Sequence, residues 1–273
     1  LEGDAQSISI HNRGFNYGDA LFETLKIVKG QILFWEDHYF RLMASMRILR
    51  MEIPMNFTLE FLEEEILKTL KANTKINDSA RVKLTINRTE GGLYGPENNE
   101  IDYLISITPS LDTLYEIDSS DYKVDLFKDF FIAPGLLSNL KTNNRILNVV
   151  GSIFAKENDL DNCLIMNTNK AIVEGLNANL FLVSGNMIKT PPLEDGGIKG
   201  VLRKQIVDIV NKLPDFELIE SSISPFELQK ADELFLTNVI MGIRPITQYR
   251  KKTYVNTVAA LLLKHLNKKL DSN

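Results

Sequence analysis

The chain has little cysteine, little histidine and no long apolar run, and each shortage excludes a class of protein. Of its 273 residues only Cys163 is a cysteine, so the chain can form neither an intrachain disulfide nor a thiolate metal site. Its three histidines, His11, His38 and His265, have no second histidine at helical metal-ligand spacing. We therefore expect no metal catalysis, and we interpret Cys163, which lies in an apolar run, as a buried thiol.

Segments that direct a chain to a membrane or to nucleic acid are also lacking. No stretch reaches the roughly 18 apolar residues that a bilayer-spanning helix needs, and the start Leu1–Asp4 has neither the basic nor the apolar region of a secretory signal. The 36 acidic residues outnumber the 31 basic ones, so the net charge of -5 offers a nucleic-acid backbone no general attraction. We expect a cytoplasmic protein without a membrane or nucleic-acid partner.

The apolar residues that are present predict an α+β fold. A hydrophobic content of 44% is enough for a substantial core. Apolar spacing predicts a hairpin over 20–34, helices over 35–51 and 59–70, and strands over 82–87 and 103–107. Farther along, it predicts a helix over 144–156, short strands over 163–183, a helix after Gly200 and a terminal helix over 255–270.

A polar, acidic segment divides this pattern. Residues 110–121 read SLDTLYEIDSSD and have no sustained period, which is typical of a surface connection. We predict a smaller N-terminal α+β domain over 1–112, a linker over 113–121 and a larger C-terminal domain over 122–273.

One loop suggests a phosphate site from its residues alone. Residues 190–200, TPPLEDGGIKG, lead directly into an amphipathic run that begins at Val201. A glycine-rich loop that opens a helix offers unpaired backbone N–H groups and the positive end of the helix dipole. Taken alone, this feature is more often the start of a helix that binds no ligand.

Six ordered motifs together are far more specific, and they resemble the class-IV aminotransferase family of pyridoxal 5'-phosphate (PLP) enzymes. The similarity covers about residues 13–245, most of the chain. The motifs are Arg13–Asp19 with Phe22–Thr24; His38–Leu42; Lys141; Glu174–Phe181; the Thr-Pro-Pro loop with Gly200–Arg203; and Glu233–Asn238.

The resemblance implies fold type IV, with PLP between a smaller and a larger domain and a homodimer as the usual assembly. It assigns Lys141 as the catalytic lysine that carries the cofactor and then acts as a base at the substrate Cα. Glu174 matches the acidic partner that keeps the pyridine nitrogen protonated, and Arg41 matches the arginine that binds the phosphate. Without the resemblance, Glu174 would pass for a charge at a strand end and Arg41 for a surface arginine.

The resemblance also assigns the other cofactor-binding residues. Backbone donors near Val201 and Leu202 complete the phosphate site with Thr237 and Asn238, and Asn177 is a further candidate beside Asn179. Turn formation explains at least one of these two asparagines as well as a ligand role does. Transaminases of the family commonly have threonine where Leu202 and Val239 stand, so two hydroxyl ligands are missing and Asn238 is expected to compensate.

Two activities of the family remain open. The run Lys141–Arg145, the absent threonine at Leu202 and the residues after Thr237 resemble the aminodeoxychorismate lyase branch. The run Arg88–Tyr94 resembles the substrate loop of that lyase, although Leu93 stands where an arginine is common. The lyase and transaminase reactions both begin with removal of the Cα proton by Lys141, so we expect the walls of the substrate pocket to decide between them. The candidates for substrate contact are Arg88, Tyr94 and Arg145. We expect the lyase, which forms 4-aminobenzoate and pyruvate. The alternatives are a branched-chain or D-amino acid aminotransferase and a non-catalytic PLP-binding protein.

Overall fold

The structure, a computed structural model, describes residues 8–73, 79–110 and 114–271. The chain divides into two compact units. Unit 1 comprises Leu1–Asp112 together with Lys141–Asn144, and unit 2 comprises Thr113–Leu140 and Arg145–Asn273. The predicted division at 113–121 does not anticipate that the short segment around Lys141 associates with unit 1.

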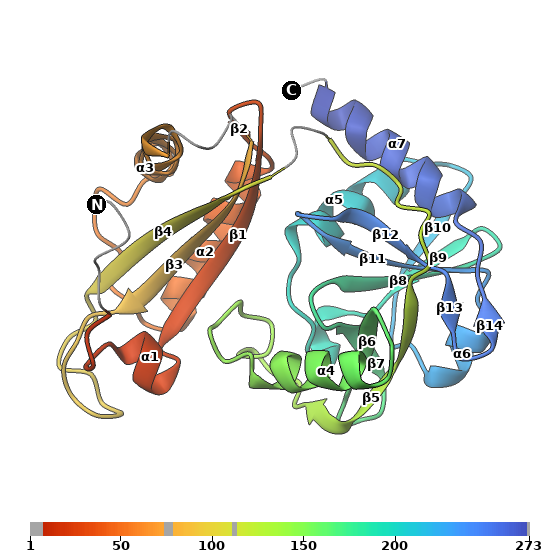
Figure 1. Cartoon of the computed structure of the whole chain (residues 1–273), viewed down its shortest axis with the longest axis horizontal. Coiled ribbons are helices and arrows are strands. Elements are labelled where there is room, and N and C mark those ends of the chain that lie inside the picture. The colour runs from red at the N-terminus through yellow and green to blue at the C-terminus, as the bar shows by residue number, and fades with distance from the viewer. Residues whose placement is uncertain (1–7, 74–78, 111–113, 272–273) are drawn as a thin grey trace. The chain divides into compact units, whose positions relative to one another are not determined.

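Unit 1 is built on an antiparallel sheet in the order β2-β1-β3-β4 (Figure 1). The strands are β1 Ala20–Val28, β2 Gln31–Ile32, β3 Ala80–Arg88 and β4 Ile101–Pro109. The predicted hairpin is confirmed: Ile27 pairs with Ile32 and Val28 with Gln31. Between these strands Lys29 and Gly30 both have positive φ, of 50° and 78°, which is the backbone that a two-residue hairpin turn requires.

In the described part of unit 1, the helices beside this sheet are α1 Arg13–Tyr17, α2 Trp35–Ile48 and α3 Leu59–Ala72. α2 packs against β1 and α3 against β4, and their buried faces carry Leu42, Met46, Leu62 and Ile66. α2 ends three residues before the predicted end at Met51. Apolar spacing continues beyond Ile48, but Arg50 adopts the left-handed conformation with φ of 57°, which terminates the helix.

Unit 2 is built on a mixed sheet in the order β10-β9-β8-β7-β6-β5-β13-β14, and β11 pairs with both β8 and β12. Several of its strands are short and fully buried, as continuous apolar runs such as Cys163–Met166 indicate. The strands are β5 Lys123–Ile132, β6 Asn162–Asn167, β7 Ile172–Gly175, β8 Asn179–Ser184, β9 Met187–Thr190, β10 Glu217–Glu220, β11 Glu233–Asn238, β12 Gly242–Ile246, β13 Gln248–Tyr249 and β14 Lys252–Thr253.

The helices of unit 2 are α4 Ile146–Glu157, α5 Val201–Val210, α6 Pro225–Lys230 and α7 Thr257–Asp271, with the 3-10 turn η2 Leu193–Asp195. α7 lies along α5, β11 and β12 (Figure 1). The predicted helix after Gly200 is α5, and the predicted terminal helix is α7. One apolar cluster joins Leu164, Leu180, Leu234 and Tyr249 on the sheet, and Cys163 is buried in a second cluster with Phe127.

The acidic connection is less exposed than its composition suggests. Its residues 111–113 lie outside the described part, but Tyr115 is buried and its hydroxyl donates a 2.6 Å hydrogen bond to the Val239 carbonyl. Asp118 pairs with Arg244. Tyr115 thus attaches this polar segment to the turn before β12. The average polarity of the segment does not predict this contact.

Neither a membrane span nor a metal centre is found among the described residues. No helix in the described ranges is both long and apolar enough to cross a membrane. No group of three or more described histidine, cysteine, aspartate or glutamate side chains is arranged to hold a metal ion.

Candidate active site

Lys141 is held on the edge of β1 in unit 1. The Phe22 N–H donates to the Lys141 carbonyl at 2.9 Å, and the Asn143 N–H donates to the Ala20 carbonyl at 3.0 Å. The Lys141 ammonium group lies 4.0 Å from the centre of the Phe22 ring. This backbone pairing restricts a segment that would otherwise be a mobile loop, and so it fixes the origin of the lysine side chain.

Arg41, Glu23 and His38 form a buried cluster in the same unit. Glu23 accepts hydrogen bonds from Arg41 Nε at 2.8 Å and Nη2 at 2.5 Å, and lies 2.8 Å from His38 Nδ1. Burial alone would raise the pKa of Glu23, but the Arg41 charge and the His38 hydrogen bond lower it to about 2. Burial lowers the pKa of His38, against the opposing effect of Glu23. The cluster therefore contains an ionised carboxylate, a guanidinium and a neutral imidazole.

In unit 2, Glu174 lies near the end of β7, buried among polar neighbours. Its Oε2 accepts from the Ile198 N–H at 3.0 Å and from Asn179 Nδ2 at 3.3 Å. Burial lowers the pKa of Arg145, and the Glu174 charge opposes that effect. The two donors stabilise a negative charge on this carboxylate, the form that can hold a protonated ring nitrogen.

The start of α5 has the geometry of an anion site. Gly200 is the N-cap and supplies no side chain to the first N–H groups, which belong to Val201 and Leu202. A Cβ atom at Gly200 would lie 1.9 Å from Asn179 Oδ1, so a larger residue there would displace the Asn179 side chain. The glycine-rich loop thus brings the helix start close to the asparagine that contacts Glu174.

The end of β11 adds an unsatisfied hydroxyl. Thr237 is 1% exposed, and its Oγ1 has no hydrogen-bond partner in the part of the chain that the structure describes. A buried polar atom without a partner is rare in folded proteins, and a bound ligand is one of the groups that can satisfy it. Together with the start of α5, this hydroxyl fits a phosphate acceptor, so the residues of unit 2 fit PLP.

The carboxamide of Asn238 holds a turn. Its Oδ1 accepts from the Ile240 and Met241 N–H groups at 2.9 and 2.8 Å, and its Nδ2 donates to the Asn177 carbonyl at 3.1 Å. Val239, where the family's transaminases have threonine, is buried within this turn. Asn238 therefore shapes the turn after Thr237 through hydrogen bonds to the backbone.

The two asparagines after Glu174 have different positions. Asn177 is exposed in the turn between β7 and β8, where its Oδ1 accepts from Asn162 at 3.0 Å. Asn179 faces Glu174 and also donates to the Ile198 carbonyl at 2.9 Å. Of the pair, Asn179 contacts the predicted cofactor partner, and the prediction of Asn177 as a cofactor ligand has no such contact to support it. Cross-strand pairing separates the two asparagines, because Asn179 on β8 lies opposite Glu174 on β7, whereas Asn177 lies in the turn.

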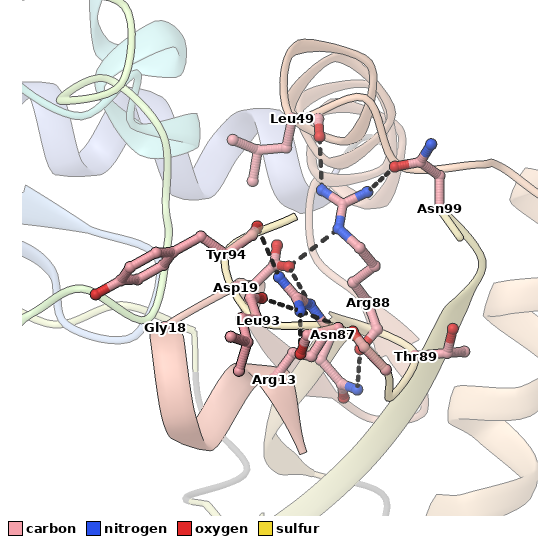
Figure 2. A network of polar contacts seen from close by, with 12 residues as sticks. Arg13, Gly18, Asp19, Leu49, Asn87, Arg88, Thr89, Leu93, Tyr94 and Asn99 are labelled. Atoms are coloured by element: carbon pink, nitrogen blue, oxygen red, sulfur yellow. Dashed lines mark hydrogen bonds and ion pairs between the residues drawn. The ribbon is translucent and has the colours of Figure 1, made fainter. Parts of the chain in front are cut away.

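The three predicted substrate residues differ in their exposure and in their hydrogen bonds. Arg88 donates to Asp19, to Asn99 and to the Leu49 carbonyl (Figure 2). It also donates to the Arg50 carbonyl. Its guanidinium thus has an internal structural role in unit 1. Tyr94 is exposed on its loop. Arg145, in unit 2, donates from Nη2 to the Leu140 carbonyl at 2.5 Å.

Comparison with known proteins shows which family the chain resembles. The family model described as "Amino-transferase class IV" matches residues 20–249. The chain is 26% identical over 269 residues to the "Putative branched-chain-amino-acid aminotransferase" of Methanocaldococcus jannaschii, covering 98% of this chain and 91% of that protein. It is 26% identical over 242 residues to the aminodeoxychorismate lyase of Vibrio harveyi, covering 88% of this chain and 86% of that protein.

A solved structure extends the likeness to the fold. The 4-amino-4-deoxychorismate lyase of Pseudomonas aeruginosa superposes with a TM-score of 0.83 and 26% identity, over 98% of this chain and 97% of that one. The predicted α+β, fold-type IV architecture is therefore confirmed. The family model covers well over half of the chain, so the protein belongs to the class-IV aminotransferase family of PLP-dependent enzymes.

Proposed function

We propose that the protein is a 4-amino-4-deoxychorismate lyase, which releases 4-aminobenzoate and pyruvate. The turn held by Asn238 carries this proposal. It shapes the phosphate end with backbone groups and an asparagine, while Leu202 and Val239 supply buried apolar side chains where transaminases commonly have threonine. The likeness to the lyases of Vibrio harveyi and Pseudomonas aeruginosa supports it.

In this proposal the candidate residues described above bind PLP. Bound PLP supplies a ring that accepts electrons from the substrate Cα. Lys141 carries the cofactor and then takes the Cα proton at its amine. Glu174 holds a proton on the ring nitrogen. Arg41, the N–H groups of Val201 and Leu202, and the Thr237 hydroxyl bind the phosphate.

A second candidate is an amino acid aminotransferase of the branched-chain or D-amino acid type. The loop after β3 favours it, because Leu93 replaces the basic residue common in the lyase loop and Arg88 is bound internally. The loop therefore presents an apolar side chain rather than a cation, which suits an amino acid with an apolar side chain. The relative from Methanocaldococcus jannaschii is consistent with this candidate.

One activity screen separates the candidates. The PLP-loaded protein is incubated with aminodeoxychorismate alone and, separately, with pairs of an amino acid and a keto acid. We expect 4-aminobenzoate and pyruvate from the first incubation without any keto-acid acceptor. Exchange of amino groups with no 4-aminobenzoate would support the aminotransferase, and neither product would support a non-catalytic PLP-binding protein.

We also propose that the enzyme is a homodimer. α4 begins directly after the Lys141 segment and exposes Ile146, Val149 and Ile153 along its length. Apolar side chains in such a row are typical of a surface that a second protein covers. Light scattering of the purified protein is expected to give twice the 31.0 kDa mass of the chain.

A further inference from the structure

A single buried arginine holds the loop that follows β3. Arg13 Nη1 donates to the carbonyls of Gly91 at 2.9 Å, Gly92 at 3.4 Å and Leu93 at 2.6 Å, and its Nη2 donates to the Tyr94 carbonyl at 3.3 Å (Figure 2). Arg13 is only 3% exposed. One guanidinium therefore satisfies four consecutive carbonyls of a glycine-rich loop.

Arg13 is itself fixed by a carboxylate that it shares with a second arginine. Asp19 Oδ2 accepts from Arg13 Nε at 2.9 Å and from Arg88 Nε at 3.0 Å. Arg88 in turn donates to the Leu49 carbonyl at 2.8 Å and to Asn99 Oδ1 at 2.5 Å. The loop is thus anchored through Arg13 and Asp19 to β3 and to the end of α2.

The same stretch of chain also holds the catalytic lysine segment. Asp19 lies within Gly18–Phe22, and this stretch pairs with Lys141–Asn144. The bonds run from the Phe22 N–H to the Lys141 carbonyl, from the Asn143 N–H to the Ala20 carbonyl and from Asn144 Nδ2 to the Gly18 carbonyl, at 2.9, 3.0 and 3.3 Å. The loop and the Lys141 segment are therefore attached to one short piece of unit 1.

The anchored loop carries two exposed side chains. Leu93 is 76% exposed and Tyr94 is 89% exposed. The Tyr94 ring lies 5.6 Å from the Tyr17 ring, which in turn lies 5.1 Å from the Arg13 guanidinium. Glycine-rich loop tips are usually mobile, and burying a guanidinium costs free energy that only good hydrogen bonds offset. The buried Arg13 anchor beneath these exposed side chains indicates that a fixed position of Leu93 and Tyr94 has a function.

We propose that Arg13 is a positioning residue for substrate selection. It holds Leu93 and Tyr94 in place to contact the part of the amino substrate that does not react. The two side chains offer an apolar surface and one phenolic hydroxyl, so the matching group is an apolar chain or ring with an oxygen acceptor. This inference rests on the proposed function, because it assigns a wall to that substrate site.

The test compares Arg13→Lys with Arg81→Lys in the PLP-loaded enzyme. Lysine keeps the charge but loses the planar fork that reaches several carbonyls. Arg81 is exposed on β3 of the same unit and is the matched control. We expect faster chymotrypsin cleavage after Leu93 or Tyr94 and a rise of about tenfold in the KM for aminodeoxychorismate, with kcat and PLP affinity nearly unchanged. The control variant is expected to match wild type in all four measurements.

Two outcomes would overturn the inference: unchanged loop cleavage in Arg13→Lys, or faster cleavage with an unchanged KM. If Arg13→Lys fails to fold, Tyr94→Ala takes its place, because this exposed side chain can be removed without loss of stability. Its KM must rise for the inference to stand. If wild type releases no 4-aminobenzoate, the lyase proposal fails by itself. Loop cleavage and the KM for the amino acid that the activity screen identifies then decide the role of Arg13.

Discussion

Glu23 and Arg41 form a two-point ion pair, with Arg41 Nε and Nη2 donating to the two carboxylate oxygens at 2.8 and 2.5 Å. The pair spans β1 and α2 and is buried on the carboxylate side. A guanidinium held in this way keeps one orientation, which lowers the entropy cost of receiving an anion. We propose that Arg41 binds the cofactor phosphate, and the contacts with Glu23 show what holds its guanidinium in position.

Replacing Arg41 with alanine is expected to weaken PLP binding by about 1.5 to 3 kcal/mol, the usual value of a hydrogen bond to a charged group. Equilibrium titration of the apo-protein with PLP measures this change. Arg47→Ala is the control, because Arg47 is exposed on the same helix. An unchanged PLP dissociation constant in Arg41→Ala would place the phosphate elsewhere.

Glu23 should also make stability depend on pH. Its pKa is lowered from 4.5 to about 2, so its ionised form stabilises the fold above the unfolded-state pKa. That contribution is lost as the pH falls from about 5 toward 2, and is at most about 3 kcal/mol. We expect the urea unfolding free energy of wild type to fall more steeply below about pH 5 than that of Glu23→Gln. Glu64→Gln, at an exposed site on α3, should keep the wild-type slope.

Lys141 is predicted to be the lysine that bonds to the cofactor. Borohydride reduction of the PLP-loaded protein, followed by peptide mapping, should place the label on Lys141. Lys83 is the matched control because its ammonium group lies 5.0 Å from the same Phe22 ring that Lys141 contacts at 4.0 Å. Lys83→Ala should keep the label and Lys141→Ala should lose it. A label on any other lysine would overturn the assignment.

Much of the fold could be predicted from local sequence patterns. Apolar periodicity and turn residues predict the β1–β2 hairpin, α3 and α5. Each of these elements buries one face, and one-sided burial leaves a regular apolar pattern in the sequence. The end of α2 and the burial of Tyr115 could not be predicted in this way. Both depend on single residues, a left-handed backbone at Arg50 and an aromatic ring inside an acidic segment.

The candidate site could be predicted only in part. Motif similarity indicated Lys141, Glu174 and Arg41, because their chemistry is fixed by the cofactor. Their partners Glu23 and Asn179 depend on pairings across strands and between a helix and a strand, which motif order does not contain. His38 and Arg41 are three residues apart on α2, so one helix face brings both to Glu23.

Glu174→Gln keeps the shape of the side chain but removes its charge, and we expect it to spare PLP binding while slowing catalysis. A loss of about 3 kcal/mol in transition-state stabilisation lowers turnover roughly a hundredfold. Hydrogen exchange at the substrate Cα in deuterated buffer measures the affected step. Glu217→Gln, at an exposed site on β10, is the control. Wild-type exchange in PLP-loaded Glu174→Gln would contradict a role in holding the ring proton.

Thr237→Val tests whether the unsatisfied hydroxyl belongs to the phosphate site. Valine has nearly the same shape, and Oγ1 of Thr237 has no partner among the described residues. The substitution should therefore leave the apo-protein equally or more stable, because a buried polar atom without a partner is removed. PLP affinity should fall by about 0.5 to 1.5 kcal/mol, the usual value of one hydrogen bond.

Thr190→Val is the matched control for this substitution. Thr190 is equally buried, but its Oγ1 donates a 2.8 Å hydrogen bond to the Leu180 carbonyl. Its replacement should destabilise the apo-protein by about 1 to 3 kcal/mol, because a buried carbonyl loses its donor, and should leave PLP affinity unchanged. Thr237→Val should therefore lower PLP affinity without lowering the melting temperature of the apo-protein, and Thr190→Val should do the reverse. If Thr237→Val destabilised the apo-protein and kept its affinity for PLP, the hydroxyl would be part of the core, and the phosphate would be bound by the start of α5 and Arg41 without it.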